Sequence, residues 1–245
     1  MAVSKKPRRI AAKSPKNKKL RRIGQESNGA QRRPIRIKKH RFQMLKEDGD
    51  FVAMVKIGRL VNAVSFGLEV LHVSRDCKTP VEKRQYYRAL FLLGGYLHEG
   101  MELVASLFTR FQTEPFFQDL RKLRFDESNK VQRKMLKVIR NSVAFHLDHD
   151  DKSTRSTLAN LKIHRYDLMS AETNTFGDFY FDLADTVDLN YLIDVLKEER
   201  TEPATLELIF KTVSEMMVEF LRGGHTFLTG LAEKMNFSDH TETAN

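Results

Sequence analysis

The chain has 245 residues, 41% of them hydrophobic, so it can bury the core of one large domain or two small ones. Its single cysteine, Cys77, excludes an intramolecular disulfide framework and a paired-cysteine metal site, and it suits the reducing cytoplasm, where we expect the protein. The net charge of +10 is uneven, because residues 1–40 hold 15 of the 42 Lys and Arg residues against one acid, Glu26.

The first 45 residues predict a disordered basic tail. They are mostly Lys, Arg, Pro, Ser and Asn, with too little apolar surface to offset the entropy lost on folding. Basic blocks at residues 5–9 and 16–22 suit RNA or ribosomal phosphates, or a targeting address; a solubilising tail without a partner is the alternative. The longest uncharged apolar run, residues 89–97, is far short of the roughly 20 residues that span a bilayer, so no membrane crossing is expected.

Residues 46–236 predict a helical domain. A first long helix is expected from residues 48–50, where acids suit a helix N-terminus; its polar stripe is thin, so we expect it to be central and covered on most sides. A second long helix is expected from Pro80, which suits a first turn, to about residue 111. Gly94 and Gly95 in its middle cost stability unless a neighbouring backbone comes close.

A short helix over residues 116–124 precedes a third main helix, which residues 126–128 cap and which runs to about residue 145. An apolar stripe is predicted along one face of this third helix, formed by Val131, Met135, Val138, Ser142 and Phe145. A basic stripe is predicted on another face, and we expect it to guide an RNA backbone through Lys130, Arg133, Lys134 and Lys137.

Residues 147–200 are less regular: a charged turn at 148–151, a short helix or strand at 158–168, an aromatic loop at 173–181 and a helix at 182–199. A fourth main helix is expected over residues 203–235, interrupted at Gly223 and Gly224, before a polar tail at 237–245. The expected fold class is all-α, an antiparallel helical bundle of four main helices plus shorter helices, preceded by the disordered basic tail.

The segment of residues 139–148 reads Ile-Arg-Asn-Ser-Val-Ala-Phe-His-Leu-Asp and resembles the motif of the HEPN superfamily, an arginine followed four to six residues later by a histidine. Arg140 and His146 match the two ends, and Asn141 matches the polar residue that often follows the arginine. The resemblance covers about eight residues in motif and residues 46–235 in architecture. It implies a homodimer that cleaves RNA without a metal or cofactor, often in defence or as a toxin, with motifs of two protomers converging on one cleft.

The chemistry of RNA cleavage asks for these residue types. A histidine can accept a proton from a ribose 2′-OH and return one to the leaving oxygen, while an arginine stabilises the charged phosphorane. Arg140, His146 and Asn141 are therefore the candidate catalytic residues, with Asn141 orienting the phosphate or His146. On a straight helix Arg140 and His146 lie about 240° apart, so the helix must end or bend, or the residues must act across a dimer.

Other interpretations stay open. Arg140 and His146 can simply cap a helix C-terminus, and the chain can be a non-catalytic module of the same fold that binds nucleic acid or protein. A metal-dependent phosphohydrolase of the HD-domain kind is a third possibility, with a solvated turn as the plain alternative; its ligands would come from His146, Asp148, His149, Asp150 and Asp151, with His98 and Asp188.

Two further groups of side chains are noted. His98, Glu99 and Glu102 are expected to form a polar strip on the exposed edge of their helix; the alternative is that Glu99 anchors the basic site by pairing with Arg140 or Lys137. An aromatic group suits base stacking or, alternatively, packing of a lid on the bundle; its members are Phe176, Phe179, Tyr180 and Phe181.

Overall fold

The structure is a computed structural model that describes residues 37, 39–73, 79–141, 152–160, 170–171, 179–180, 182–196 and 202–237. The chain divides into two units, Met1–Arg36 and Ile37–Asn245, and every described residue belongs to the second. The predicted disorder of the tail therefore lies, up to residue 36, outside the described residues.

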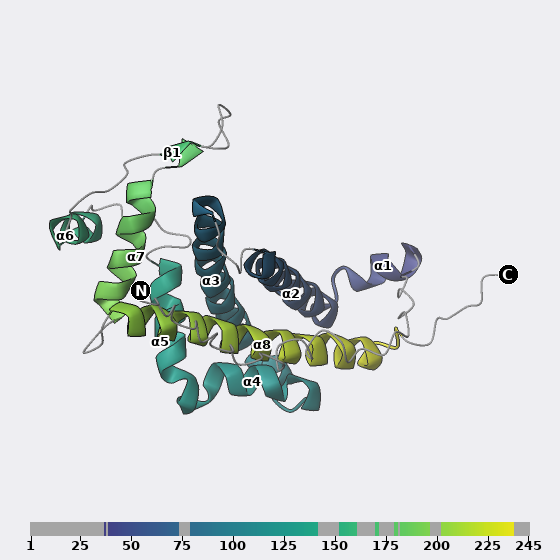
Figure 1. The fold of residues 1–245 in the computed structure, drawn as a ribbon. Helices are drawn as coiled ribbons and strands as arrows, with labels where there is room; N and C mark the ends of the chain where they lie inside the picture. Colours follow the sequence, from purple (N-terminus) through teal and green to yellow (C-terminus); the bar gives the residue numbers. More distant parts are fainter. Residues whose placement is uncertain are drawn as a thin grey trace, which may run out of the picture. The chain divides into compact units, whose positions relative to one another are not determined.

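The described part of the chain is all-α, as predicted from its hydrophobic periodicity (Figure 1). Its helices are α1 Lys39–Leu45, α2 Gly49–Val73, α3 Pro80–Phe111, α4 Gln118–Phe125, α5 Lys130–Ile139, α6 Lys152–Asn160, α7 Asp182–Leu196 and α8 Glu202–Lys234. Two 3-10 turns flank α4, η2 Pro115–Phe117 and η3 Glu127–Asn129. One short antiparallel pair of strands is described, β1 Ser170–Ala171 with β2 Phe179–Tyr180.

The starts of the two first long helices follow from local side-chain chemistry. Asp48 Oδ1 accepts hydrogen bonds from the backbone N–H groups of Asp50 and Phe51 at 2.8 and 2.9 Å, which satisfies two N–H groups at the start of α2. At α3, Thr79 and Glu82 form a reciprocal capping box with distances of 3.2 and 3.0 Å, and Pro80 occupies the first turn. Both predicted helix starts are confirmed.

Helix α2 runs antiparallel to α3. Asp50, at the start of α2, contacts Arg110 at the end of α3, whereas Gly67, near the other end of α2, lies against Leu93. A Cβ at Gly67 would lie 2.6 Å from Leu93 Cδ2, so the absence of a side chain allows the two helices to approach closely.

Helices α3 and α8 run parallel to each other. Tyr86 stacks on Phe210 near the start of both helices, with ring centroids 5.9 Å apart. Phe111 meets Phe227 edge-on near their ends, with centroids 5.2 Å apart. The bundle therefore contains one parallel pair of long helices beside its antiparallel ones.

The core lies where α2, α3, α4, α5 and α8 meet. Its largest fully buried side chains come from segments far apart in the sequence, namely Phe111, Phe117, Phe220, Phe227, Ile57, Leu93, Leu97, Met101, Leu120, Leu136, Ile139 and Leu192. Burying a large apolar side chain of this kind contributes about 1.5–3 kcal/mol, so these contacts dominate the stability of the fold.

Helix α8 is continuous through Gly223 and Gly224, and the predicted interruption there is wrong. Both glycines are buried. A Cβ at Gly223 would lie 3.0 Å from Leu120 Cδ2 of α4, and one at Gly224 would lie 2.6 Å from Val61 Cγ2 of α2. The pair therefore marks close helix contacts and not a break.

Helix α2 is not covered on most sides, contrary to the sequence-based prediction. Phe51, Ile57, Val64 and others face the core, but large apolar residues on the opposite side are exposed, with Phe66 66% and Val73 80% accessible. By length and composition, α2 is also the one described helix long and apolar enough to cross a membrane, a property that core helices of soluble proteins share.

The domain begins earlier than the predicted boundary at residue 46. In α1, the Arg41 guanidinium donates a 2.5 Å hydrogen bond to the carbonyl oxygen of Met235 and lies over the Phe237 ring at 4.8 Å. Phe42 meets Phe51 edge-on, with centroids 6.1 Å apart. Phe237, placed by prediction in the polar C-terminal tail, is buried. These long-range contacts leave no mark in local composition.

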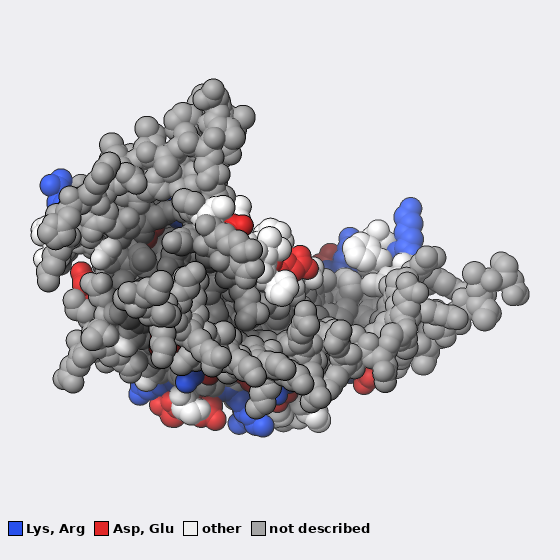
Figure 2. Space-filling model, in the orientation of Figure 1, with Lys and Arg blue, Asp and Glu red and all other residues white. Residues whose placement is uncertain are grey.

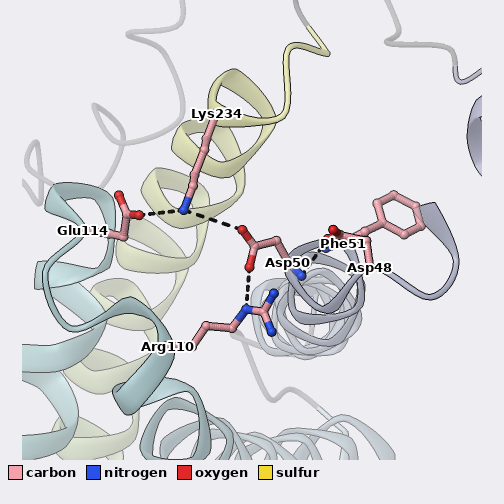
Figure 3. A network of polar contacts seen from close by, with 6 residues as sticks. All are labelled: Asp48, Asp50, Phe51, Arg110, Glu114 and Lys234. Atoms are coloured by element: carbon pink, nitrogen blue, oxygen red, sulfur yellow. Dashed lines mark hydrogen bonds and ion pairs between the residues drawn. The ribbon is translucent and has the colours of Figure 1, made fainter. Parts of the chain in front are cut away.

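A network of ion pairs, here called the closing cluster, joins α2, α3, η2 and α8 (Figure 3). Its members are Asp50, Arg110, Glu114 and Lys234. Asp50 is only 20% exposed and lies 2.5 Å from Arg110 Nε and 3.6 Å from Lys234 Nζ, which is also 2.6 Å from Glu114 Oε1. The hydrogen bond to Glu114 is the main cause that raises the pKa of Lys234.

Candidate functional site

Helix α5 is the element that carries the candidate motif, and Asp126, the acid predicted to cap it, caps instead the 3-10 turn η3 that leads into it. Asp126 Oδ1 accepts hydrogen bonds from the backbone N–H and the hydroxyl of Ser128 at 2.9 and 2.8 Å. These bonds, the backbone one first, lower the pKa of the Asp126 carboxyl. Turn η3 then leads directly into α5 at Lys130.

The buried face of α5 is rotated from the predicted apolar stripe. Met135, Leu136 and Ile139 are buried, whereas Val131 is 65% exposed. The membership of Val131 in the apolar face is therefore wrong, and Leu136 and Ile139 were missed. Both apolar sets have helical spacing, so periodicity alone did not separate them.

Gly94 brings the end of α5 against α3. A Cβ there would lie 2.8 Å from Ile139 Cγ2, so only glycine leaves room for the buried isoleucine. This contact explains why α3 tolerates a glycine in its middle. It also places Arg140, the next residue, beside α3.

Arg140 is held by α3 through a pairing with Glu99, which the sequence offered only as the alternative to an exposed polar strip. Its Nε donates a hydrogen bond to Glu99 Oε1 at 2.7 Å, and its Nη1 donates one to Asn141 Oδ1 at 3.0 Å. The Arg140 side chain is 30% exposed and that of Glu99 43%, so the pair lies at the surface. The guanidinium is thus oriented while solvent still reaches it.

The helix changes geometry at this pair. Arg140 and Asn141 adopt a π-helical turn, and the Arg140 backbone N–H is shared between the carbonyls of Leu136 and Lys137. A wider turn advances each residue by a smaller angle than an α-helix does. The expected separation of about 240° between Arg140 and His146 involves residues 142–146, which lie outside the described residues.

His98 is a histidine close enough to Arg140 to feel its charge. It lies on α3 one turn after Gly94, the residue that contacts α5. Burial is the largest influence on its pKa and lowers it from 6.5, against the opposing carboxylates of Glu102 and Glu99 and with a smaller lowering from Arg140 and Lys137. His98 is thus disposed to be neutral near pH 7.

We call this group the Arg140 cluster, comprising His98, Glu99, Glu102, Lys137, Arg140 and Asn141. Arg124 of α4 also contacts this cluster, which the sequence did not indicate. The Arg124 Nε donates a hydrogen bond to the Met101 carbonyl oxygen at 3.1 Å, and its Nη2 lies 3.6 Å from Glu102 Oε1. Nothing in the spacing of the α4 residues signals a contact with a helix that precedes it in the chain.

The predicted basic stripe is only partly available to a ligand. Lys134 and Lys137 are exposed. Lys130 pairs with Glu127 at 3.5 Å, and Arg133 donates a 2.6 Å hydrogen bond to the Asp126 carbonyl oxygen. Figure 2 shows basic and acidic side chains interspersed at the lower edge of the view, where Figure 1 places α4 and α5. This surface has mixed charge, with two lysines leading to Arg140.

Several predicted residues fall outside the described residues, namely His146, Asp148, His149, Asp150, Asp151, Phe176 and Phe181. Among the described residues, no three His, Cys, Asp or Glu side chains form a group able to hold a metal ion. Asp188 lies 3.8 Å from Arg88 Nη1. Phe179 and Tyr180 form the short strand β2.

Comparison with models of protein families, with curated proteins and with solved structures finds no match to this chain. Function is therefore inferred from the residues and their geometry.

Proposed function

We propose that this chain is a metal-independent endoribonuclease of the HEPN kind that acts on RNA as a homodimer. Arg140 stabilises the negative charge of the phosphorane, His146 transfers protons, and Asn141 orients the phosphate. The observation that carries the proposal is the fixed Arg140 guanidinium, oriented by Glu99 and Asn141 at a π turn while it stays accessible.

Orientation matters because a preorganised cation stabilises developing charge without reorganising during the reaction. Glu99 offsets part of the charge of Arg140, so the approach of RNA depends on other cations. Lys134 and Lys137 are exposed on the same helix and supply them. The basic tail adds further affinity for phosphates.

A second candidate is a non-catalytic module of the same fold that binds nucleic acid. It is favoured by the 2.7 Å bond that engages Arg140 with Glu99, since an arginine committed to a carboxylate can serve to join α3 and α5. In that case Lys134 and Lys137 bind the RNA backbone and no bond is cleaved.

The test incubates the purified full-length protein with single-stranded RNA, with and without a chelator, and repeats this with His146→Ala and Arg140→Ala. His225→Ala is the matched control, because His225 is exposed on α8. Cleavage that survives chelation, is lost in both motif variants and persists in the control supports the proposal. Binding without cleavage favours the module, and cleavage that the chelator abolishes favours the metal-dependent phosphohydrolase.

A further inference from the structure

The outward side of α2 carries a regular line of exposed residues, which we call the α2 stripe. Successive members are four or three residues apart, so they lie along one face of the helix: Val55, Arg59, Asn62, Phe66, Glu69 and Val73. Phe66 and Val73 are among the most exposed large apolar residues described. Three large apolar side chains, those of Val55, Phe66 and Val73, are therefore exposed on one face of a single helix.

Two opposite charges on the α2 stripe have no ion-pair partner among the described residues, Arg59 and Glu69. They are ten residues apart, which is about 15 Å along an α-helix, so they do not reach each other within one copy. A partner that covers this face is therefore favoured when it offers an acid opposite Arg59 and a base opposite Glu69.

A second copy of α2 meets this requirement when it runs in the opposite direction. With a two-fold axis at the level of Val64, Arg59 of each copy lies opposite Glu69 of the other, and Val55 lies opposite Val73. Phe66 lies opposite Asn62 and close to the axis, where the two rings meet. Each contact occurs twice, as in an isologous interface.

We propose that the α2 stripe is a self-association surface through which two copies of this chain pair with their α2 helices antiparallel. The pairing does not depend on the proposed ribonuclease activity, because the stripe shares no residue with the Arg140 cluster. It covers Phe66 and Val73 and gives Arg59 and Glu69 partners. A single helix stripe is a small interface, so the expected affinity is micromolar.

A lipid bilayer fits this face less well. The α2 stripe alternates apolar residues with Arg59, Asn62 and Glu69, and placing an arginine or an acid in the hydrocarbon region costs about 2.5–3.5 kcal/mol by insertion scales. In the antiparallel pair, by contrast, Arg59 and Glu69 lie opposite partners of the other charge.

The test is a charge exchange followed by sedimentation equilibrium of the full-length chain at about 1–100 µM, the range in which small interfaces associate. Arg59→Glu places an acid opposite an acid, and Glu69→Arg places a base opposite a base, so each single variant should raise the dimer dissociation constant about tenfold or more. The double variant, and an equimolar mixture of the two single variants, restore complementary charges and should recover association. Lys211→Glu, the same charge change on α8, is the control.

Circular dichroism establishes that each variant is folded. A wild-type chain that stays monomeric overturns the proposal, and so does self-association whose stoichiometry and dissociation constants are the same in the wild type and in both single variants, since that association forms elsewhere. Association that the double variant and the mixture both fail to recover also overturns it. A monomer that sediments with phosphatidylcholine and phosphatidylserine vesicles, and does so less well when Phe66 is changed to Asp, assigns the face to a membrane instead.

Discussion

The closing cluster and the Arg140 cluster are both built on ion pairs with side chains of α3, but the pairs have different roles. In the closing cluster, Asp50 is only 20% exposed and contacts two cations from two other helices. In the Arg140 cluster, the acid is more exposed, with Glu99 at 43%, whereas Arg140 at 30% is less exposed than Arg110 at 50%. A histidine and an amide lie nearby. The ion pairs of the closing cluster join several elements and stabilise the fold, whereas the Arg140–Glu99 pair orients the Arg140 side chain.

The largest expected effect on stability is at the closing cluster. Asp50→Ala leaves Arg110 without its 2.5 Å partner and removes one of two acids from Lys234, so the free energy of unfolding should fall by about 2 kcal/mol. Urea denaturation followed by circular dichroism measures it. Glu127→Ala, which removes an exposed pair with Lys130, should change stability by less than about 0.5 kcal/mol. Equal losses of unfolding free energy in Asp50→Ala and Glu127→Ala would contradict the distinction between the closing cluster and an exposed ion pair.

The second expected effect comes from α1, which docks beside the closing cluster. Deleting residues 1–45 removes the contacts of Arg41 with Phe237 and of Phe42 with Phe51, at a cost of about 1–2 kcal/mol. Deleting only residues 1–36 should leave the melting temperature unchanged and flatten the salt dependence of RNA binding. Calorimetry measures the melting temperature, and binding titrations at several salt concentrations measure the salt dependence of RNA binding. Unfolding of the shorter deletion would place essential contacts in the tail.

At the Arg140 cluster we expect the opposite balance between stability and function. Glu99→Gln should change the free energy of unfolding by less than about 0.5 kcal/mol, because both partners are accessible. RNA cleavage should nevertheless fall about tenfold or more, because Arg140 loses its orientation. Glu102→Gln on the same helix is the control and should retain cleavage. A large loss of stability with unchanged specific activity would make the Arg140–Glu99 pair structural.

The smallest expected effect is a pH dependence from His98. Its pKa is lowered in the folded state, so the unfolded chain binds more protons just below pH 6.5. The stability that the neutral imidazole contributes is full above the ordinary value of 6.5 and is lost as pH falls through the lower folded-state pKa. His98→Gln should flatten the dependence of unfolding free energy on pH between 7 and 5. If the slope of unfolding free energy against pH is unchanged in His98→Gln, groups other than His98 cause the pH dependence.

Much of the fold followed from local sequence signals. Asp48, Thr79 and Asp126 cap helices where the sequence placed the starts, and Pro80 occupies a first turn. These features depend on interactions between residues two to four positions apart, which a sequence displays directly. The pairing of Glu99 with Arg140 was only an alternative to an exposed polar strip in the sequence, and the structure contains it.

What escaped prediction depends on contacts between distant segments. The pair Gly223 and Gly224 was taken for a break, although it accommodates Leu120 and Val61 from other helices. Arg124 joins the Arg140 cluster through Met101 and Glu102, and Arg41 anchors α1 at the far end of the chain. The exposed face of α2 was missed for the same reason, since an apolar helix gives no sign of which side lacks a neighbour.

The parallel packing of α3 and α8 bears on how the chain folds during synthesis. Phe220 and Phe227 complete the core around residues of α2 and α3 that leave the ribosome more than a hundred residues earlier. Until α8 is made, the parts of α2 and α3 that α8 covers stay exposed, and contacts of such long sequence separation close slowly. The nascent chain therefore exposes apolar surface of α2 and α3 until α8 is synthesised, and chaperones bind exposed apolar surface of this kind.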